Sequence, residues 1–218
     1  MRKSMLFCFA FSVLLAVAFI ARPSAGNAGF QQPKVADASM PVSKKYTLER
    51  ILAMNRDEVI ALWKTLPPVQ IKELNGHYMG LVPNAGDKTR QASTTDYMYN
   101  ENSPRGYWLG KAYKQTGENK GEGYNRWRFP GGRIVLNLRF ATEMGTSLID
   151  GKPALMMYYG AYNDSTLVDE LRKLDDYVYL GVGTRKMPDG KRSEPGHFVL
   201  LGPTDEWVGV GDVKAAVK

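Results

Sequence analysis

From Gly76 onward, apolar and polar residues alternate with a period of two, and this alternation restricts the fold more than any other feature of the chain. The stretch "RIVLNLRFA" is the clearest case, with Ile134, Leu136, Leu138 and Phe140 on one face. About ten short segments of this kind follow one another, separated by turn signals such as "IDGKP", "LDDY" and "PDGK". Sequential short strands predict an antiparallel meander, which closes into a barrel because closure removes unpaired strand edges.

The predicted fold is therefore mainly β, an antiparallel meander barrel of about ten strands. The strand candidates include "TDYMYN" (95–100) and "EWVGVG" (206–211). A short N-terminal helix precedes the barrel in "NRDEVIALWKTLPP", where Asn55 is the expected N-cap and Glu58 completes a capping box. A shorter helical turn, "TLERILAM", comes before it. We expect Trp63, on the apolar stripe of the longer helix, to pack against the barrel.

Residues 1–28 have the pattern of a secretory signal peptide. Arg2 and Lys3 precede an apolar run from Met5 to Ile20, and small residues follow up to Ala28, the expected cleavage point. Cleavage after Ala25 and retention as a membrane anchor are the alternatives, although the run is short for a span. We therefore expect a periplasmic or secreted protein. Residues 29–46 predict a flexible leader, and residues 47–218 hold the helix and the barrel.

Charge and residue types exclude several classes of function. Loss of residues 1–28 removes three basic residues and the single cysteine, which leaves 26 basic and 22 acidic residues. These charges are interspersed, so we expect no nucleic-acid partner, although transient contact with an anionic membrane surface remains open. His77 and His197 have no metal-ligand spacing, and neither a Gly-x-Ser-x-Gly elbow nor a phosphate loop is present. We expect no metal, no cofactor and no stable protein partner.

Three blocks of the sequence resemble a known family. "LWKTLPPVQIKELNGHYMG" (62–80) is similar to the entry of GXWXG-type, lipocalin-like barrels, with Tyr78 where that motif has Trp. "YWLGKAY" (107–113) and "LVDELRKLDDYVYLGVG" (167–183) resemble later blocks, so the resemblance covers roughly residues 60–202. It implies a calycin-type cup that holds a hydrophobic small molecule. Nitrobindin, a ten-stranded relative in architecture, holds haem, for which His197 would be the ligand here.

The segment "DELRKLDDYVYLGVG" (169–183) predicts a hairpin with charges on strands otherwise suited to burial. With Asp175-Asp176 as a two-residue turn, one face holds Glu170, Arg172, Tyr177 and Tyr179. The other face holds Asp169, Leu171, Lys173, Val178, Leu180 and Val182. Because the second face is more apolar, we expect it to point inward and to leave Glu170 and Arg172 in solvent. Asp169 is then a carboxylate among apolar side chains that must be paired or hydrated at the strand end.

The opposite orientation of this hairpin also remains open. Glu170 and Arg172, flanked by Tyr177 and Tyr179, would then form a polar clamp inside an apolar cavity. The candidate catalytic residues are accordingly Asp169, Glu170 and Arg172. Other polar positions on strand candidates complete the candidate ligand-binding set, which comprises Tyr97, Tyr99, Asn137, Arg139, Tyr158, Tyr177 and Tyr179. The predicted function is binding of a lipid, fatty acid or terpenoid. An enzyme using acid–base chemistry on such a molecule and a haem-binding barrel are the alternatives.

The export prediction can be checked directly. The mature protein should begin at or near Gly29 and be recovered soluble, because the apolar run ends in a cleavable small-residue segment. Terminal sequencing of protein secreted by a host with a general export pathway measures this. An intact Met1 on membrane-bound protein would contradict it.

Overall fold

The computed structural model of the chain describes residues 46–83 and 88–211. The predicted signal peptide and all but the last residue of the predicted leader lie outside these described residues. Within them, no helix is both long and apolar enough to cross a membrane.

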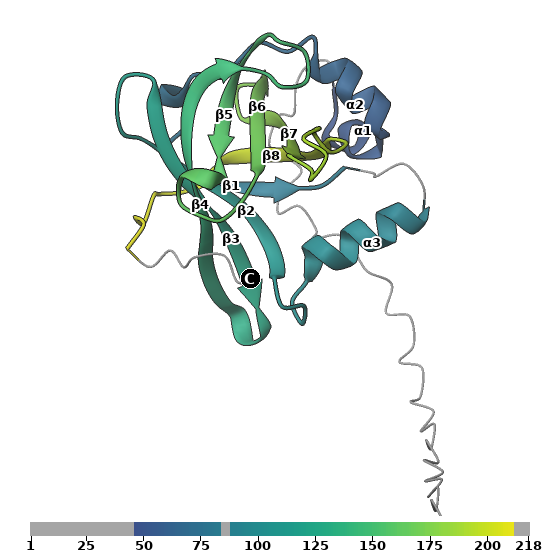
Figure 1. The fold of residues 1–218 in the computed structure, drawn as a ribbon. Coiled ribbons are helices and arrows are strands. Elements are labelled where there is room, and N and C mark those ends of the chain that lie inside the picture. Colours follow the sequence, from purple (N-terminus) through teal and green to yellow (C-terminus); the bar gives the residue numbers. More distant parts are fainter. Residues whose placement is uncertain (1–45, 84–87, 212–218) are drawn as a thin grey trace, which may run out of the picture. The chain divides into compact units, whose positions relative to one another are not determined.

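Eight antiparallel strands form a closed barrel in which each strand pairs with the next and β8 pairs with β1 (Figure 1). The strands are β1 (Gly76–Leu81), β2 (Gly106–Gln115), β3 (Lys120–Phe129), β4 (Arg133–Thr146), β5 (Pro153–Tyr158), β6 (Leu167–Asp175), β7 (Val178–Arg185) and β8 (Gly196–Asp205). Short 3-10 turns occupy η1 (Ile71–Glu73), η2 (Pro130–Gly132) and η3 (Tyr159–Ala161). The prediction of a mainly β antiparallel meander barrel is confirmed, with eight strands in the described residues in place of about ten.

Two segments predicted as strands are not barrel strands. "TDYMYN" overlaps the end of helix α3 (Lys88–Tyr99), where Thr94, Tyr97 and Met98 line one wall of a cavity. Those three positions have the i, i+3, i+4 spacing of a helix face. A segment of six residues is too short to distinguish this spacing from the period-two alternation of a strand. "EWVGVG" follows β8 outside any ladder, because β8 already pairs on both sides with β1 and β7.

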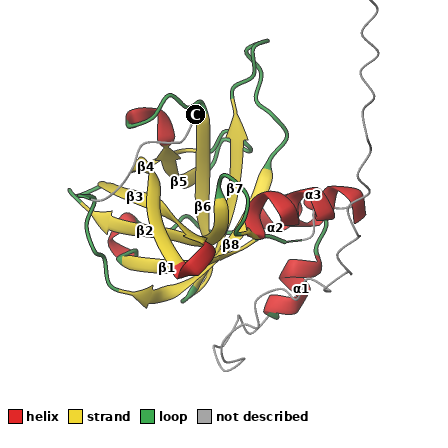
Figure 2. Cartoon of the chain, turned by 90° about the horizontal axis from the view of Figure 1, so that it is seen from below, coloured by secondary structure: helices red, strands yellow, loops and turns green. Residues whose placement is uncertain are grey.

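Two N-terminal helices, α1 (Leu48–Ala53) and α2 (Arg56–Trp63), pack on the outside of the barrel (Figure 2). The predicted capping box of α2 is present: the Asn55 side chain accepts a hydrogen bond from the Glu58 backbone, and the Glu58 carboxylate accepts one from the Asn55 backbone. The apolar faces of both helices cover outward residues of β5, β7 and β8. This outer cluster contains Ile51, Val59, Leu62, Trp63, Ala154, Met156, Val178, Leu180, Val182, Val199 and Leu201.

The aromatic residue of the Gly-x-Tyr-x-Gly motif lies in the barrel interior. Tyr78 is fully buried and meets the rings of Tyr113 and Tyr179 edge to face. The glycines let the backbones approach closely: a Cβ on Gly80 would lie 2.5 Å from the Trp108 ring, and one on Gly110 (φ +127°) only 2.0 Å from the Tyr78 carbonyl oxygen. The motif thus joins β1 to β2 around one core aromatic side chain.

The register of the β6–β7 hairpin differs by one residue from the prediction. The turn consists of Asp176 and Tyr177, Asp175 pairs with Val178, and an irregularity at Leu174 precedes the Lys173–Tyr179 pair. A one-residue slip reverses the faces of one strand relative to the other. Asp169 and Leu171 point inward as expected, but the inward residue of β7 is Tyr179. The expectation that Val178, Leu180 and Val182 face inward is wrong, because they belong to the outer cluster under the helices.

The docking of α2 predicts a large effect of truncating Trp63, whose side chain is wholly buried. Trp63→Ala should lower the free energy of unfolding by about 3–5 kcal/mol, because it leaves a cavity between helix and barrel. Urea denaturation measures this. Trp207→Ala is the matched control, since Trp207 is only partly buried beside Tyr124 and should cost clearly less. Equal losses for the two variants would contradict tight docking of α2.

Candidate functional site

A cavity of about 380 Å³ lies inside the barrel, bounded by α3 and by the loop that joins β7 to β8. Most of its wall is apolar or aromatic. The apolar wall residues are Val82, Pro83, Met98, Trp108, Trp127, Leu138, Leu167, Pro195 and Phe198. The volume and lining are typical of sites for small organic molecules, which occupy roughly 300–1,000 Å³.

Three polar side chains, Lys111, Tyr159 and Asp169, interrupt the apolar wall where the cavity meets the aromatic core. The Lys111 ammonium donates to Asp169 Oδ2 at 2.9 Å, to Asn125 Oδ1 at 3.1 Å and to the Tyr159 hydroxyl oxygen. Tyr159 donates its hydroxyl hydrogen to Asp169 Oδ2 at 2.8 Å. Trp108 Nε1 donates to Asn125 Oδ1 at 3.0 Å. We call these five residues the polar cluster.

Lys111 is held in a largely aromatic environment. Its side chain is 3% exposed, and its ammonium lies 4.9–5.7 Å from the ring centres of Trp108, Phe140, Tyr159 and Phe198. Burial lowers the pKa of the Lys111 ammonium, and the Asp169 carboxylate opposes this shift. Burial also raises the pKa of the Tyr159 hydroxyl well above its usual value. Tyr159 is therefore a neutral hydrogen-bond donor and acceptor in the cluster.

The Asp169 carboxylate is oriented by the same contacts. Both of its side-chain hydrogen bonds in the described part of the chain end on Oδ2. Oδ1 points toward Gly183, where a Cβ would lie only 2.3 Å from it. Glycine at position 183 therefore makes room for the carboxylate, and Asp169 and Gly183 both line the cavity. Oδ1 thus remains an acceptor at the cavity wall.

The mouth of the cavity carries more positive than negative charge. Arg56 of α2 forms an ion pair with Glu194 of the β7–β8 loop, which ties that loop to the helix. Arg105 lies over the Tyr97 ring with its guanidinium carbon 4.3 Å from the ring centre. Arg185 also lines the mouth. Polar ligand groups at this end would meet solvent-accessible charges.

Some of the predicted site residues lie at or near the cavity. Asp169 and Tyr97 line it, and Tyr97 is at its exposed rim. Tyr99, the last residue of α3, is buried, and its hydroxyl oxygen accepts a hydrogen bond from the Val82 backbone at 2.7 Å. Tyr179 is buried in the inner core against Tyr78. Asn137 is buried opposite Asn125 in the β3–β4 ladder.

The other predicted ligand-binding residues do not line this cavity. Arg139 forms an ion pair with Glu122, and its guanidinium lies over the Tyr162 ring. Tyr158 packs with the outer cluster under the helices, and Tyr177 is exposed in the β6–β7 turn. Arg139 and Tyr158 lie on strand positions that alternate with the inward-facing ones, and Tyr177 lies in a turn outside the strands.

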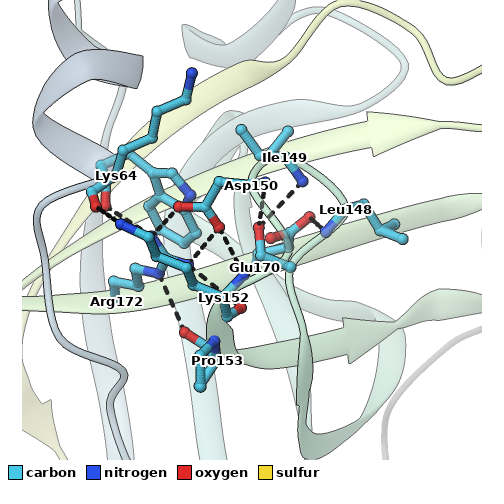
Figure 3. A network of polar contacts seen from close by, with 10 residues as sticks. Lys64, Leu148, Ile149, Asp150, Lys152, Pro153, Glu170 and Arg172 are labelled. Atoms are coloured by element: carbon cyan, nitrogen blue, oxygen red, sulfur yellow. Dashed lines mark hydrogen bonds and ion pairs between the residues drawn. The ribbon is translucent and has the colours of Figure 1, made fainter.

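Glu170 and Arg172 point outward from β6, as the first predicted orientation has them, but the expectation that they lie in solvent is wrong. They are 1% and 0% exposed beneath α2 and the β4–β5 loop. Arg172 donates two hydrogen bonds to the Asp150 carboxylate, at 2.7 and 2.8 Å, and others to the Trp63 and Pro153 carbonyls (Figure 3). Glu170 accepts from the Leu148 backbone, and burial raises its pKa. Both residues anchor the helix and the loop to the barrel, so neither reaches the cavity.

The sequence interpretation missed Lys111 and Tyr159. Lys111 shares its strand face with Tyr113, so it is a charge on an apolar face, the same anomaly that singled out Asp169. Alternation along β5 places Leu155 and Met157 inward, and continuing it one step predicts Tyr159 where Tyr158 had been chosen. Both signals were present in the sequence, but neither indicates by itself that the two side chains meet.

The histidines do not form a metal centre. Among the described residues, no group of three or more His, Cys, Asp or Glu side chains is placed to hold a metal ion. His77 shares a hydrogen bond of 2.8 Å with the Tyr124 hydroxyl, and its burial lowers its pKa to about 4. His197 lines the cavity. Haem binding through His197 stays a prediction.

No protein family model matches the chain, and no curated protein matches it. Among solved structures, a crystal structure of a protein from Thermomonospora curvata aligns with a TM-score of 0.47 at 20% identity, over 68% of this chain and 88% of that one. Odorant Binding Protein OBP1 aligns with a TM-score of 0.36 at 10% identity, over 64% and 77% of the two chains. These similarities are too distant to assign a family or a ligand.

The Arg172–Asp150 contact predicts a specific acid sensitivity. Hydrogen bonds from Arg172 lower the pKa of Asp150 from 3.8 to about 2, so the ionised form stabilises the folded state. This stabilisation is complete above about pH 4 and is lost as the pH falls toward 2. Wild type should lose up to about 2 kcal/mol more than Asp150→Asn between pH 5 and pH 2 in urea denaturation. Asp164→Asn, in an exposed loop, should keep the wild-type pH dependence.

Proposed function

We propose that this protein binds a hydrophobic small molecule that carries one uncharged polar group, with that group against the polar cluster. The observation that carries the proposal is the buried Lys111–Asp169 pair facing a cavity whose other walls are mainly apolar. Such a site would gain free energy by burying the apolar body of the ligand and would orient the ligand through one polar contact.

The apolar walls decide what the ligand body must be. Trp108, Trp127 and Phe198 offer large flat surfaces, and Leu138, Leu167 and Met98 fill the spaces between them. Removing apolar ligand surface from water is worth roughly 25 cal/mol per Å² before the costs of association. Aliphatic chains and terpenoid skeletons suit these walls, whereas sugars and nucleotides would leave hydroxyls or phosphates unpaired.

The charge balance of the polar cluster decides what the polar group must be. Lys111 already directs its three ammonium hydrogens to acceptors on Asp169, Asn125 and Tyr159. A fatty-acid carboxylate would bring a second anion beside Asp169 in a poorly hydrated site, which costs free energy. A hydroxyl group, by contrast, can donate to Asp169 Oδ1. Neutral alcohols are therefore favoured over fatty acids.

Export is part of the same proposal. The N-terminal pattern of residues 1–28 supports delivery to the periplasm or the medium, where a carrier of sparingly soluble molecules would meet its ligand. The basic residues Arg105 and Arg185 at the cavity mouth would also favour brief contact with anionic membrane surfaces, from which such ligands come.

Narrowing the cavity mouth tests the proposal. Thr94 lines the cavity from α3, whereas its neighbour Thr95 does not. Thr94→Trp should weaken binding of decanol about tenfold or more, because the indole would occupy ligand space, a loss of about 1.4 kcal/mol. Isothermal titration calorimetry measures both affinities. Thr95→Trp is the matched control and should bind decanol as the wild type does.

The same titration with decanoate separates the two kinds of polar group. Decanoate should bind more weakly than decanol at neutral pH, because its charge would face the Asp169 carboxylate. Failure of wild type to bind decanol, or equal weakening by the two tryptophan substitutions, would contradict the proposed site.

A further inference from the structure

We propose that Lys111 forms a reversible imine with aldehyde or ketone ligands that enter the barrel cavity. This inference rests on the proposed function, since it names the chemical class of one ligand for the same cavity. It also assigns the cavity a covalent mode of capture.

The position of the amine is the first argument. Lys111 lines the cavity, and its Nζ is held by three acceptors with Phe140 and Phe198 close by. A ligand whose apolar body fills the cavity would carry its polar tip to this nitrogen. Proximity of that kind converts a bimolecular addition into an effectively intramolecular one, which is a large rate advantage.

The availability of the nitrogen lone pair is the second argument. Only a neutral amine attacks a carbonyl carbon, and burial lowers the pKa of Lys111, which favours the neutral form. Asp169 Oδ2, 2.9 Å away, is positioned to accept the proton that must leave. Tyr159, hydrogen-bonded to the same oxygen, can donate to the carbonyl oxygen as negative charge develops there.

The reaction balances without any further reactant. Lys111 passes one proton to Asp169, and its nitrogen lone pair bonds to the carbonyl carbon. A second proton then moves from that nitrogen to the oxygen, which gives a neutral carbinolamine. The nitrogen lone pair next expels the hydroxyl group, which leaves as water with the proton that Asp169 returns. One hydrogen stays on the nitrogen, so the product is a protonated imine beside the Asp169 carboxylate. The charge of the pair is the same before and after, so no unpaired buried charge is created.

Reductive trapping tests the inference. The full mature protein is incubated at neutral pH with decanal and sodium cyanoborohydride, which converts an imine into a stable secondary amine. Peptide mapping by mass spectrometry should find Lys111 modified at least about tenfold more than Lys114, an exposed lysine on the same strand. Decanol should compete with this labelling, because it occupies the same cavity. Lys111→Met should lose the dominant adduct, and Lys114→Met should retain it.

Decanol binding distinguishes failure of this inference from failure of the proposed function. If decanol binds but decanal labels only exposed lysines, the imine is wrong and the carrier proposal stands. If decanol does not bind and Lys111 is unlabelled, both are wrong. Asp169→Asn should slow labelling of Lys111 by about tenfold or more, because the proton acceptor is lost. Unchanged labelling in that variant would overturn the role given to Asp169. Should Lys111→Met fail to fold, the wild-type peptide map alone decides the matter.

Discussion

The ion pair between Lys111 and Asp169 is the interaction on which the interior of the barrel depends. Closure of the eight-strand ladder directs inward side chains into one shared, mainly aromatic space, where an unpaired charge would cost several kcal/mol. Each of the two charges offsets part of the free-energy cost of burying the other. Tyr159 and Asn125 complete their hydrogen bonds. A protein whose buried ion pair is replaced by apolar residues of similar volume is often no less stable. The stability of the fold therefore does not by itself explain why this pair is present. Its position on a cavity wall is the stronger reason to connect it with ligand binding.

The second buried cation, Arg172, shows how differently the same residue types can be used. It lies on the outer side of β6, enclosed by α2 and the β4–β5 loop, and its guanidinium binds the Asp150 carboxylate and backbone carbonyls. Planar, multidentate contacts of this kind suit a structural clamp, because they fix several segments at once. Lys111, by contrast, points inward from β2 and lines the cavity, and burial lowers the pKa of its ammonium.

The helices have two different relations to the barrel. α1 and α2 cover apolar residues on the outside of β5, β7 and β8, so that part of the wall is buried on both faces. α3 instead supplies Thr94, Tyr97 and Met98 to the cavity wall. Met98 also packs against the inner core, and Tyr99 at the end of α3 is buried. Access to the polar cluster therefore depends on α3 and on the β7–β8 loop, which the Arg56–Glu194 ion pair connects to α2.

The sequence by itself determined the barrel and the capped helix α2, because each is encoded by local periodicity or by residues a few positions apart. It also identified Asp169 as a charge among apolar side chains, without deciding whether that charge is buried. It could not determine the site, since Lys111 and Asp169 are 58 residues apart and alternation fixes only which residues of one strand share a face. An irregularity at Leu174 and the turn at Asp176–Tyr177 shift the β6–β7 pairing by one residue, which is why Tyr179 and not Val178 faces inward. Likewise, nothing local to Glu170 and Arg172 indicates that a helix covers them. Only the tertiary structure decided these points, because inter-strand register and helix docking are set by packing between distant segments.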